Sequence, residues 1–198
     1  MRLSILQYGD LILRAKGKLI EQVDARIHEL AANMIETMHA ANGVGLAAQQ
    51  IGEAIQLAVL DVSQVKDRPM TMRLNGANLD PAGVMPLVLV NPRVDLGRET
   101  EPGTEGCLSF PEITGEIDRA KSISVQAQNL DGNAICIETS GFLARAIQHE
   151  VDHLNGILFI DRMSSGTKAG LSSKLNRLRK ETQRGMKHRQ RAVAETTL

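Results

Sequence analysis

Aromatic side chains and cysteines are both scarce in this chain of 198 residues. Aromatic residues make up 2% of it, with no Trp, one Tyr and three Phe, which argues against binding modes that stack bases or sugars on aromatic rings. The only cysteines are Cys107 and Cys136, too few for a disulfide scaffold and typical of a reducing compartment. The longest apolar stretches, such as residues 84–90, are too short to cross a bilayer. No membrane span is therefore expected.

The amino-terminal residues do not resemble a targeting segment. MRLSILQYGD contains neither a basic stretch followed by a long apolar run nor an Arg- and Ser-rich amphipathic pattern. We therefore expect a cytoplasmic protein with no membrane partner.

The composition is that of an ordinary globular protein, but the charge is unevenly distributed. Hydrophobic residues make up 42% and charged residues 23% of the chain, enough for a core and unlike a disordered chain. Residues 162–198 hold ten Lys and Arg against two Glu, whereas residues 1–161 carry a net charge of −8. We expect one compact domain over 1–163 and a basic helical tail over 164–198. The tail is either a solvated helix face or a surface that meets an anionic partner such as RNA.

Apolar periodicity predicts three helices. The first covers residues 23–41, and the second follows a Ser140 cap and ends near Leu154. The third begins within 164–168 and continues through the tail with only a narrow apolar stripe.

Short β-like runs lie between the first two helices. Residues 64–86 are rich in Pro, Gly, Asn and Asp and are expected to form a long surface loop, while Cys136 is expected to be a buried strand residue. The order of helices and strands predicts an α+β fold. The expected strands are 56–61, 87–90, 123–127 and 134–138.

The sharpest local pattern is QHEVDH, on the second predicted helix. His149 and His153 lie four residues apart, so both imidazoles share one helix face and can reach one metal ion. Glu150 follows the first histidine, where a carboxylate can act as general base on a water at that ion. Two histidines satisfied by ordinary helix contacts are the alternative.

A catalytic metal site of this kind requires a third protein ligand and an open position. Cys107, in EGCLSFPE, is the better candidate, because Cys136 has the alternation of a strand residue. A rival hypothesis makes Cys107 a nucleophile paired with a histidine, but it leaves Glu150 and the second histidine without a role.

A third cluster is GVGLAAQQ, residues 43–50. Its small residues allow the backbone to approach a ligand or another strand closely, and the Gln50 amide can stabilise a developing oxyanion. Alone, the cluster is equally typical of a tight turn between a helix and a strand.

Taken together and in this order, GVGLAAQQ, EGCLS (105–109) and QHEVDHLNG (148–156) closely resemble the three motifs of the peptide deformylase family. The resemblance extends from the amino terminus to about Asp161, and it is looser over 64–86 and the tail. It implies an α+β fold with antiparallel and mixed β-sheets around a central helix that carries the HExxH motif, followed by a carboxy-terminal helix.

The resemblance implies a metal-dependent hydrolase of protein biosynthesis. Such an enzyme removes the formyl group from the N-formylmethionine of nascent polypeptides by means of a metal-bound hydroxide. One ion per chain is implied, Fe²⁺ with Zn²⁺, Ni²⁺ or Co²⁺ as substitutes, held by Cys107, His149 and His153. Glu150 would transfer protons. Gln50 and the backbone N–H of Leu108 would hold the formyl oxygen.

The substrate contacts follow from helix spacing and from the resemblance. Phe142 and Ala146 precede His149 by seven and three residues and so share its face, where with Val44 they would line an apolar pocket for methionine. Ordinary core packing is an equally good account of Phe142. By resemblance, Gly45 and Glu105 would contact the peptide backbone. The partners implied are formylmethionyl peptides and, through the tail, the ribosome, with no DNA.

Two other functions share some of these features. A zinc metallopeptidase also carries H-E-x-x-H, but usually takes its third ligand from a downstream His or Glu, and the downstream Asp161 and Glu181 fit no such pattern. A ribosome- or RNA-binding protein with a structural metal would usually supply four ligands, and only three are found.

Overall fold

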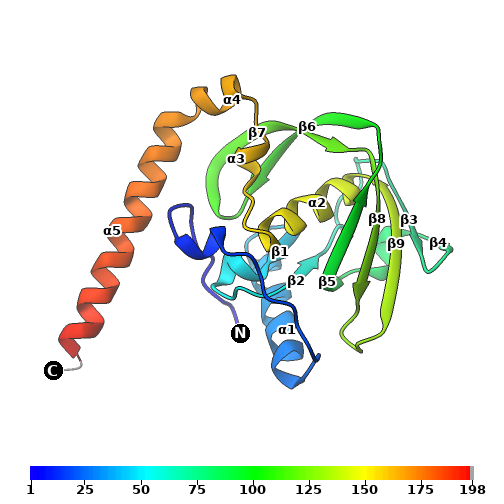
Figure 1. The fold of residues 1–198 in the computed structure, drawn as a ribbon, viewed down its shortest axis with the longest axis horizontal. Coiled ribbons are helices and arrows are strands. Elements are labelled where there is room, and N and C mark those ends of the chain that lie inside the picture. The colour runs from blue at the N-terminus through cyan, green and yellow to red at the C-terminus, as the bar shows by residue number, and fades with distance from the viewer. Residues whose placement is uncertain (197–198) are drawn as a thin grey trace.

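The structure is a computed structural model that describes residues 1–196, with the side chains of residues 1–188. It is an α+β fold in which one helix lies between a large sheet and a small β-ribbon (Figure 1). The helices are α1 (Ala25–Ala40), α2 (Phe142–Leu154), α3 (Phe159–Arg162), α4 (Ser165–Gly170) and α5 (Ser172–Thr196), with short 3₁₀ turns η1 (Leu11–Arg14), η2 (Ala48–Ile51) and η3 (Pro81–Val84). The strands are β1 (Gly45–Ala47), β2 (Leu57–Leu60), β3 (Met70–Leu74), β4 (Ala77–Leu79), β5 (Leu87–Leu96), β6 (Thr100–Cys107), β7 (Phe110–Ala120), β8 (Ser122–Gln128) and β9 (Ala134–Gly141).

Both sheets are built from antiparallel strand pairs. The larger has the order β1-β2-β5-β8-β9-β3-β4, and β6 pairs with β7 in a separate ribbon. Helix α2 contacts strands of the large sheet and also β7. The ends of β6 and β1 and one face of α2 therefore meet near the centre of the molecule.

Helix α2 is buried on nearly every face, and both its apolar and its polar residues are shielded from solvent. Leu143 and Ile147 are fully buried against the large sheet, in a cluster with Leu89, Val125 and Ile137. Its polar residues Arg145, His149 and Glu150 are also buried, beneath the β6–β7 ribbon and strand β1. Since buried polar groups must be paired or must serve a ligand, this helix carries the candidate site.

The first predicted helix and all four predicted strands are confirmed, with shifted ends. The predicted Ser140 cap of α2 is wrong. Gly141 is the N-cap residue, at φ 69°, and makes no side-chain cap. An added Cβ at Gly141 would lie 2.1 Å from the carbonyl oxygen of Pro69, so only glycine allows the chain to pass there.

The surface loop predicted over 64–86 is also wrong for most of its length. It contains β3, β4 and η3, and β3 pairs with β9 to extend the large sheet. Asn75 and Gly76, both at positive φ, form the two-residue turn between β3 and β4, which is the Asn-Gly hairpin signal. Cys136 is exposed rather than buried, because on β9 its neighbour Ile137 faces the core.

The carboxy-terminal helix is interrupted at Leu171, which separates α4 from α5. Its narrow apolar stripe packs through Leu175, which is buried in a cluster that includes Leu13 and Phe110 and is flanked by partly buried Leu171 and Leu178. Helix α5 also lies against the amino-terminal segment, where an added Cβ at Gly9 would be 2.8 Å from the carbonyl oxygen of Arg179. The rest of α5 extends away from the sheet (Figure 1). Among the described residues, no helix is both long and apolar enough to span a membrane.

Candidate active site

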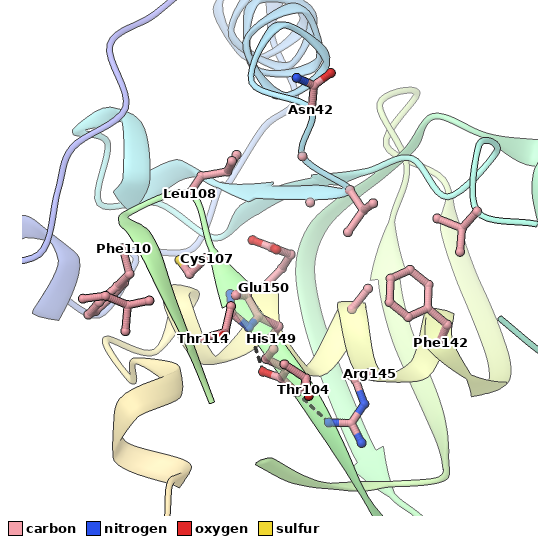
Figure 2. A pocket seen from close by; sticks show the side chains of 18 of the residues that line it. Asn42, Thr104, Cys107, Leu108, Phe110, Thr114, Phe142, Arg145, His149 and Glu150 are labelled. Atoms are coloured by element: carbon pink, nitrogen blue, oxygen red, sulfur yellow. Dashed lines mark hydrogen bonds and ion pairs between the residues drawn. The ribbon is translucent and has the colours of Figure 1, made fainter. Parts of the chain in front are cut away.

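The structure brings the three expected metal ligands together. His149 and His153 project from one face of α2 with ring centroids 5.1 Å apart. Cys107 is the last residue of strand β6, and Figure 2 shows it close to His149 and Glu150. One ligand atom from each lies within 4.8 Å of those of the other two, and Cys107 Sγ is 3.2 Å from His153 Nε2. Thiolate and imidazole donors at this spacing suit a tetrahedral transition-metal site with one open position.

The electrostatics of the two histidines differ. Burial opposes a positive charge on His149, but neighbouring Cys107 and Glu105 outweigh burial and raise the pKa of His149. Burial and the nearby positive His149 lower the pKa of His153. Cys107, His149 and His153 together therefore favour a positive charge between them, and a bound divalent cation can supply that charge in place of the proton on His149.

Glu105 orients His149. His149 Nδ1 donates a hydrogen bond to Glu105 Oε2 at 2.9 Å, which directs Nε2 toward the other ligands. Burial alone would raise the pKa of Glu105, but hydrogen bonds from His149 and Arg119 outweigh it and lower the pKa to about 2. A carboxylate that holds a ligating histidine in this way fixes its tautomer and ring orientation.

This placement changes the expectation for Glu105. Both its carboxylate oxygens accept hydrogen bonds, from His149, Arg119 and Arg145, so the side chain faces the protein and only its backbone is left for a peptide. Arg119 also pairs with Asp152 of α2. Sequence reasoning missed this buried network, although Arg145, His149 and Asp152 share one face of α2 by their spacing.

Arg145 binds the ribbon to α2. Its guanidinium donates to the carbonyl oxygens of Ile117 at 2.9 Å and Glu101 at 2.8 Å, on β7 and β6. An added Cβ at Gly103 would lie 2.7 Å from the guanidinium carbon, so the ribbon passes close over it. The ribbon that carries Cys107 is thus tied to the helix that carries the histidines.

Glu150 lies beside the three ligands and is buried. Burial raises the pKa of Glu150 to about 7, while the positive charge of His149 opposes that rise. Its Oε2 atom has no hydrogen-bond partner among the residues whose side chains are described, so it can bind a water molecule. An added Cβ at Gly45 would lie 2.3 Å from Glu150 Oε1. Position 45 therefore requires glycine to make room for this carboxylate.

Gln50 is held with its NH₂ group toward Cys107. The backbone N–H of Ala47 donates to Gln50 Oε1 at 2.8 Å, and Gln50 Nε2 donates to Ser109 Oγ at 3.3 Å and to Cys107 Sγ at 3.6 Å. Leu108, next to Cys107, lies in the turn between β6 and β7. The amide N–H groups of Gln50 thus point toward the candidate metal ligands, on the side where Cys107 lies.

A cavity of about 770 Å³ opens onto this group (Figure 2). Its walls come from residues 42–45, from the end of β6 and the start of β7, from α2, and from Gln64, Val65, Asp67 and Arg68. The expected pocket residues Val44, Phe142 and Ala146 all line it, as do Gly45 and Glu105. Phe142 lies toward one end of the cavity and Cys107 toward the other.

Comparison with known proteins identifies the family. The family profile described as Polypeptide deformylase matches residues 2–169. The chain belongs to the polypeptide deformylase family. This family removes the N-formyl group from nascent peptides, and its members are metalloenzymes.

Named deformylases resemble the chain over most of its length. It is 43% identical to the peptide deformylase of Opitutus terrae, over 94% of this chain and 98% of that protein. The Acinetobacter baumannii peptide deformylase is 42% identical, over 92% and 94%.

Solved deformylase structures share the fold. The Thermotoga maritima enzyme is 39% identical, with a TM-score of 0.70 over 83% of this chain and 99% of that one. Peptide deformylase 1B of Arabidopsis thaliana is 34% identical, with a TM-score of 0.78 over 92% and 93%. These comparisons confirm that the three motifs are those of a deformylase. They do not support the two alternatives, a zinc metallopeptidase and an RNA-binding protein with a structural metal.

Proposed function

We propose that this deformylase hydrolyses the formyl group from N-formylmethionine at the start of newly synthesised polypeptides, with the residue roles given below. The observation that carries the proposal is the position of Glu150. Its unpartnered carboxylate oxygen is buried beside a Cys-His-His group, at the end of a cavity large enough for a peptide.

The proposed cofactor is one Fe²⁺ per chain, with Zn²⁺, Ni²⁺ or Co²⁺ as substitutes, held by Cys107, His149 and His153. The donor set fits such ions, because one thiolate and two imidazoles lie within 4.8 Å of one another. When bound, a divalent ion supplies Lewis acidity that activates water and polarises a carbonyl. The Glu105 carboxylate supports the site by orienting His149.

Glu150 is the proposed general base and acid. Its free oxygen is buried at the cavity end, where it can take a proton from the attacking water and deliver it to the departing amine. Gly45 keeps that space open, because any side chain there would collide with the carboxylate.

Gln50 and the backbone N–H of Leu108 are proposed to hold the formyl oxygen. The Gln50 amide is fixed by Ala47 and Ser109, so its donors are oriented before substrate binds. Preorganised donors of this kind typically lower a barrier by roughly 2.7–4 kcal/mol each.

The methionine side chain is proposed to lie against Val44, Phe142 and Ala146. These residues line the cavity next to the ligand group, and an apolar, unbranched side chain suits such a wall. The backbones of Gly45 and Glu105, at the cavity edge, are the proposed contacts for the peptide main chain.

The tail is proposed to be a separate unit that meets the ribosome in the cytoplasm. We place the catalytic domain at 1–163 and the tail at 164–198, with no membrane or DNA partner. The support is the net charge of the tail, ten Lys and Arg against two Glu from residue 162 onward, which attracts RNA phosphate.

A formate-release assay tests the proposal. The purified, metal-loaded chain should release one formate per formyl-Met-Ala-Ser peptide and should leave the unformylated peptide intact. Glu181→Gln, on exposed α5, is the control variant and should behave as wild type. Peptide-bond cleavage of the unformylated peptide, or no formate from the formylated one, would contradict the proposal.

A further inference from the structure

Arg68 lies at the end of the cavity that is remote from the candidate metal ligands. The guanidinium carbon of Arg68 lies 4.9 Å from the centre of the Phe142 ring, and both residues line the cavity. Figure 2 shows Phe142 at that end and Cys107 at the other. A guanidinium stacked on an aromatic face keeps its N–H donors available at its edges.

The segment that carries Arg68 is held firmly in place. The N–H of Phe142 donates to the carbonyl oxygen of Pro69 at 3.1 Å, and Val65 packs against the core beneath α2. Gly141 has no Cβ, and this allows Pro69 to approach so closely. Arg68 is therefore fixed to the start of α2.

Among the described residues, no acidic side chain balances the charge of Arg68. By contrast, Arg73 pairs with Glu138 and Arg145 with Glu105. An exposed, stacked guanidinium with free donors is suited to bind a carboxylate through two parallel hydrogen bonds.

The distance along α2 indicates which substrate residue reaches Arg68. Phe142 precedes His149 by seven residues, about 10 Å along the helix axis. In an extended peptide the first and third Cα atoms are about 7 Å apart and their side chains point to the same side. The formyl carbon precedes the first Cα by about a further 2.4 Å, so a formyl group beside His149 puts the third residue close to the position of Phe142. If the peptide runs along α2 away from the ligand group and methionine packs against Val44, Ala146 and Phe142, the third side chain reaches Arg68, which stacks on Phe142.

We propose that Arg68 forms a subsite for the third residue of the formylated peptide and favours an acidic side chain there. The proposal rests on the proposed function. The preference for an acidic side chain requires direct contact with Arg68. The cavity mouth as a whole does not attract anions, because Asp67 and Glu112 also line the cavity and carry negative charge.

The test compares peptides that differ only in charge at one position. Formyl-Met-Ala-Glu-amide and formyl-Met-Ala-Gln-amide have similar shape, and amidation removes the terminal carboxylate. At low ionic strength, kcat/KM for the Glu peptide should exceed that for the Gln peptide by roughly threefold to fivefold, the upper range for a partly exposed ion pair. Formyl-Met-Glu-Ala-amide should show no such advantage over its Gln counterpart.

Variants separate contact from general charge. Arg68→Ala should bring the Glu/Gln ratio close to one, and Arg68→Glu should invert it below one. Lys66→Ala is the matched control, because Lys66 is exposed on the same segment but does not line the cavity, and it should keep the wild-type ratio.

Three results would overturn the subsite. These are a wild-type ratio near one, an unchanged ratio in Arg68→Ala, or an equal loss in Lys66→Ala, which would indicate a general field effect. Absence of formate from every peptide would instead overturn the proposed function, and the subsite with it.

Discussion

His149 donates a hydrogen bond from Nδ1 to the Glu105 carboxylate at 2.9 Å, and Glu105 is itself held by two buried arginines. A carboxylate in EGCLS thereby sets the direction of an imidazole in QHEVDH, 44 positions further along the chain. The second and third motifs are thus coupled by a buried ion network as well as by the group of potential metal ligands that they share.

Glu105→Gln should weaken metal binding. Gln keeps the shape but removes the charge, so His149 loses its anionic partner. We expect metal affinity to fall by about 10- to 100-fold, as for other partners of ligating histidines, measured by competition with a chelator. Glu116→Gln, exposed on β7, is the control and should keep wild-type affinity. Wild-type affinity in Glu105→Gln would show that the hydrogen bond does not support the site.

Gly45→Ala should impair catalysis through Glu150. The new Cβ would lie 2.3 Å from Glu150 Oε1, so either the carboxylate or strand β1 must shift. A misplacement of about 1 Å can cost on the order of 10²-fold in rate, and we expect at least a tenfold loss of kcat. Gly83→Ala serves as the control, because no described atom would lie within 4 Å of a Cβ there. If Gly45→Ala turned over substrate like wild type, the close packing on Glu150 would not matter for catalysis.

A variant that tests ribosome binding by the tail must leave the packing of α5 intact. Leu175 is buried in a core cluster with Leu171 and Leu178 at its edge, so removal of the whole tail would expose apolar surface. Replacing five exposed basic residues of α5 with Gln keeps these leucines and removes half of the ten positive charges found from residue 162 onward: Lys174, Arg177, Lys180, Arg184 and Lys187. We expect formate release from a short peptide to remain near wild type and ribosome co-sedimentation to weaken, with wild-type binding falling as salt rises. Equal co-sedimentation of both proteins would identify the tail as a solvated helix.

The sequence predicted those parts of the fold whose signals are local. The first helix has clear apolar periodicity, and two histidines four residues apart define one helix face wherever the helix lies. Ribbon strand β6 was missed because TEPGTEGC combines Pro, Gly and acidic residues and has no apolar alternation. It forms because Arg145 binds the ribbon from α2, a contact between distant segments.

The contacts of Glu105 and Arg68 were missed by sequence reasoning for the same reason, because they join segments that are distant along the chain. The role of Glu105 as a partner of His149 depends on a pairing between β6 and α2, and Arg68 reaches Phe142 only because Pro69 is bonded to the start of α2. Contacts of this kind have no spacing rule along the chain. The Asn75–Gly76 turn differs, because its dipeptide is a recognised hairpin signal that a closer search of the loop would have found.

The most direct test of the central claim measures metal content and formate release on the same preparation of wild type and Glu150→Gln. The account predicts that the variant retains one metal ion per chain, because Glu150 is not a ligand, and loses about 10²- to 10⁴-fold in turnover, because it removes the proton-transferring group. Cys107→Ser should instead lose metal, since a neutral hydroxyl is a poor replacement for a thiolate. Near wild-type turnover in Glu150→Gln, with metal retained, would contradict the account.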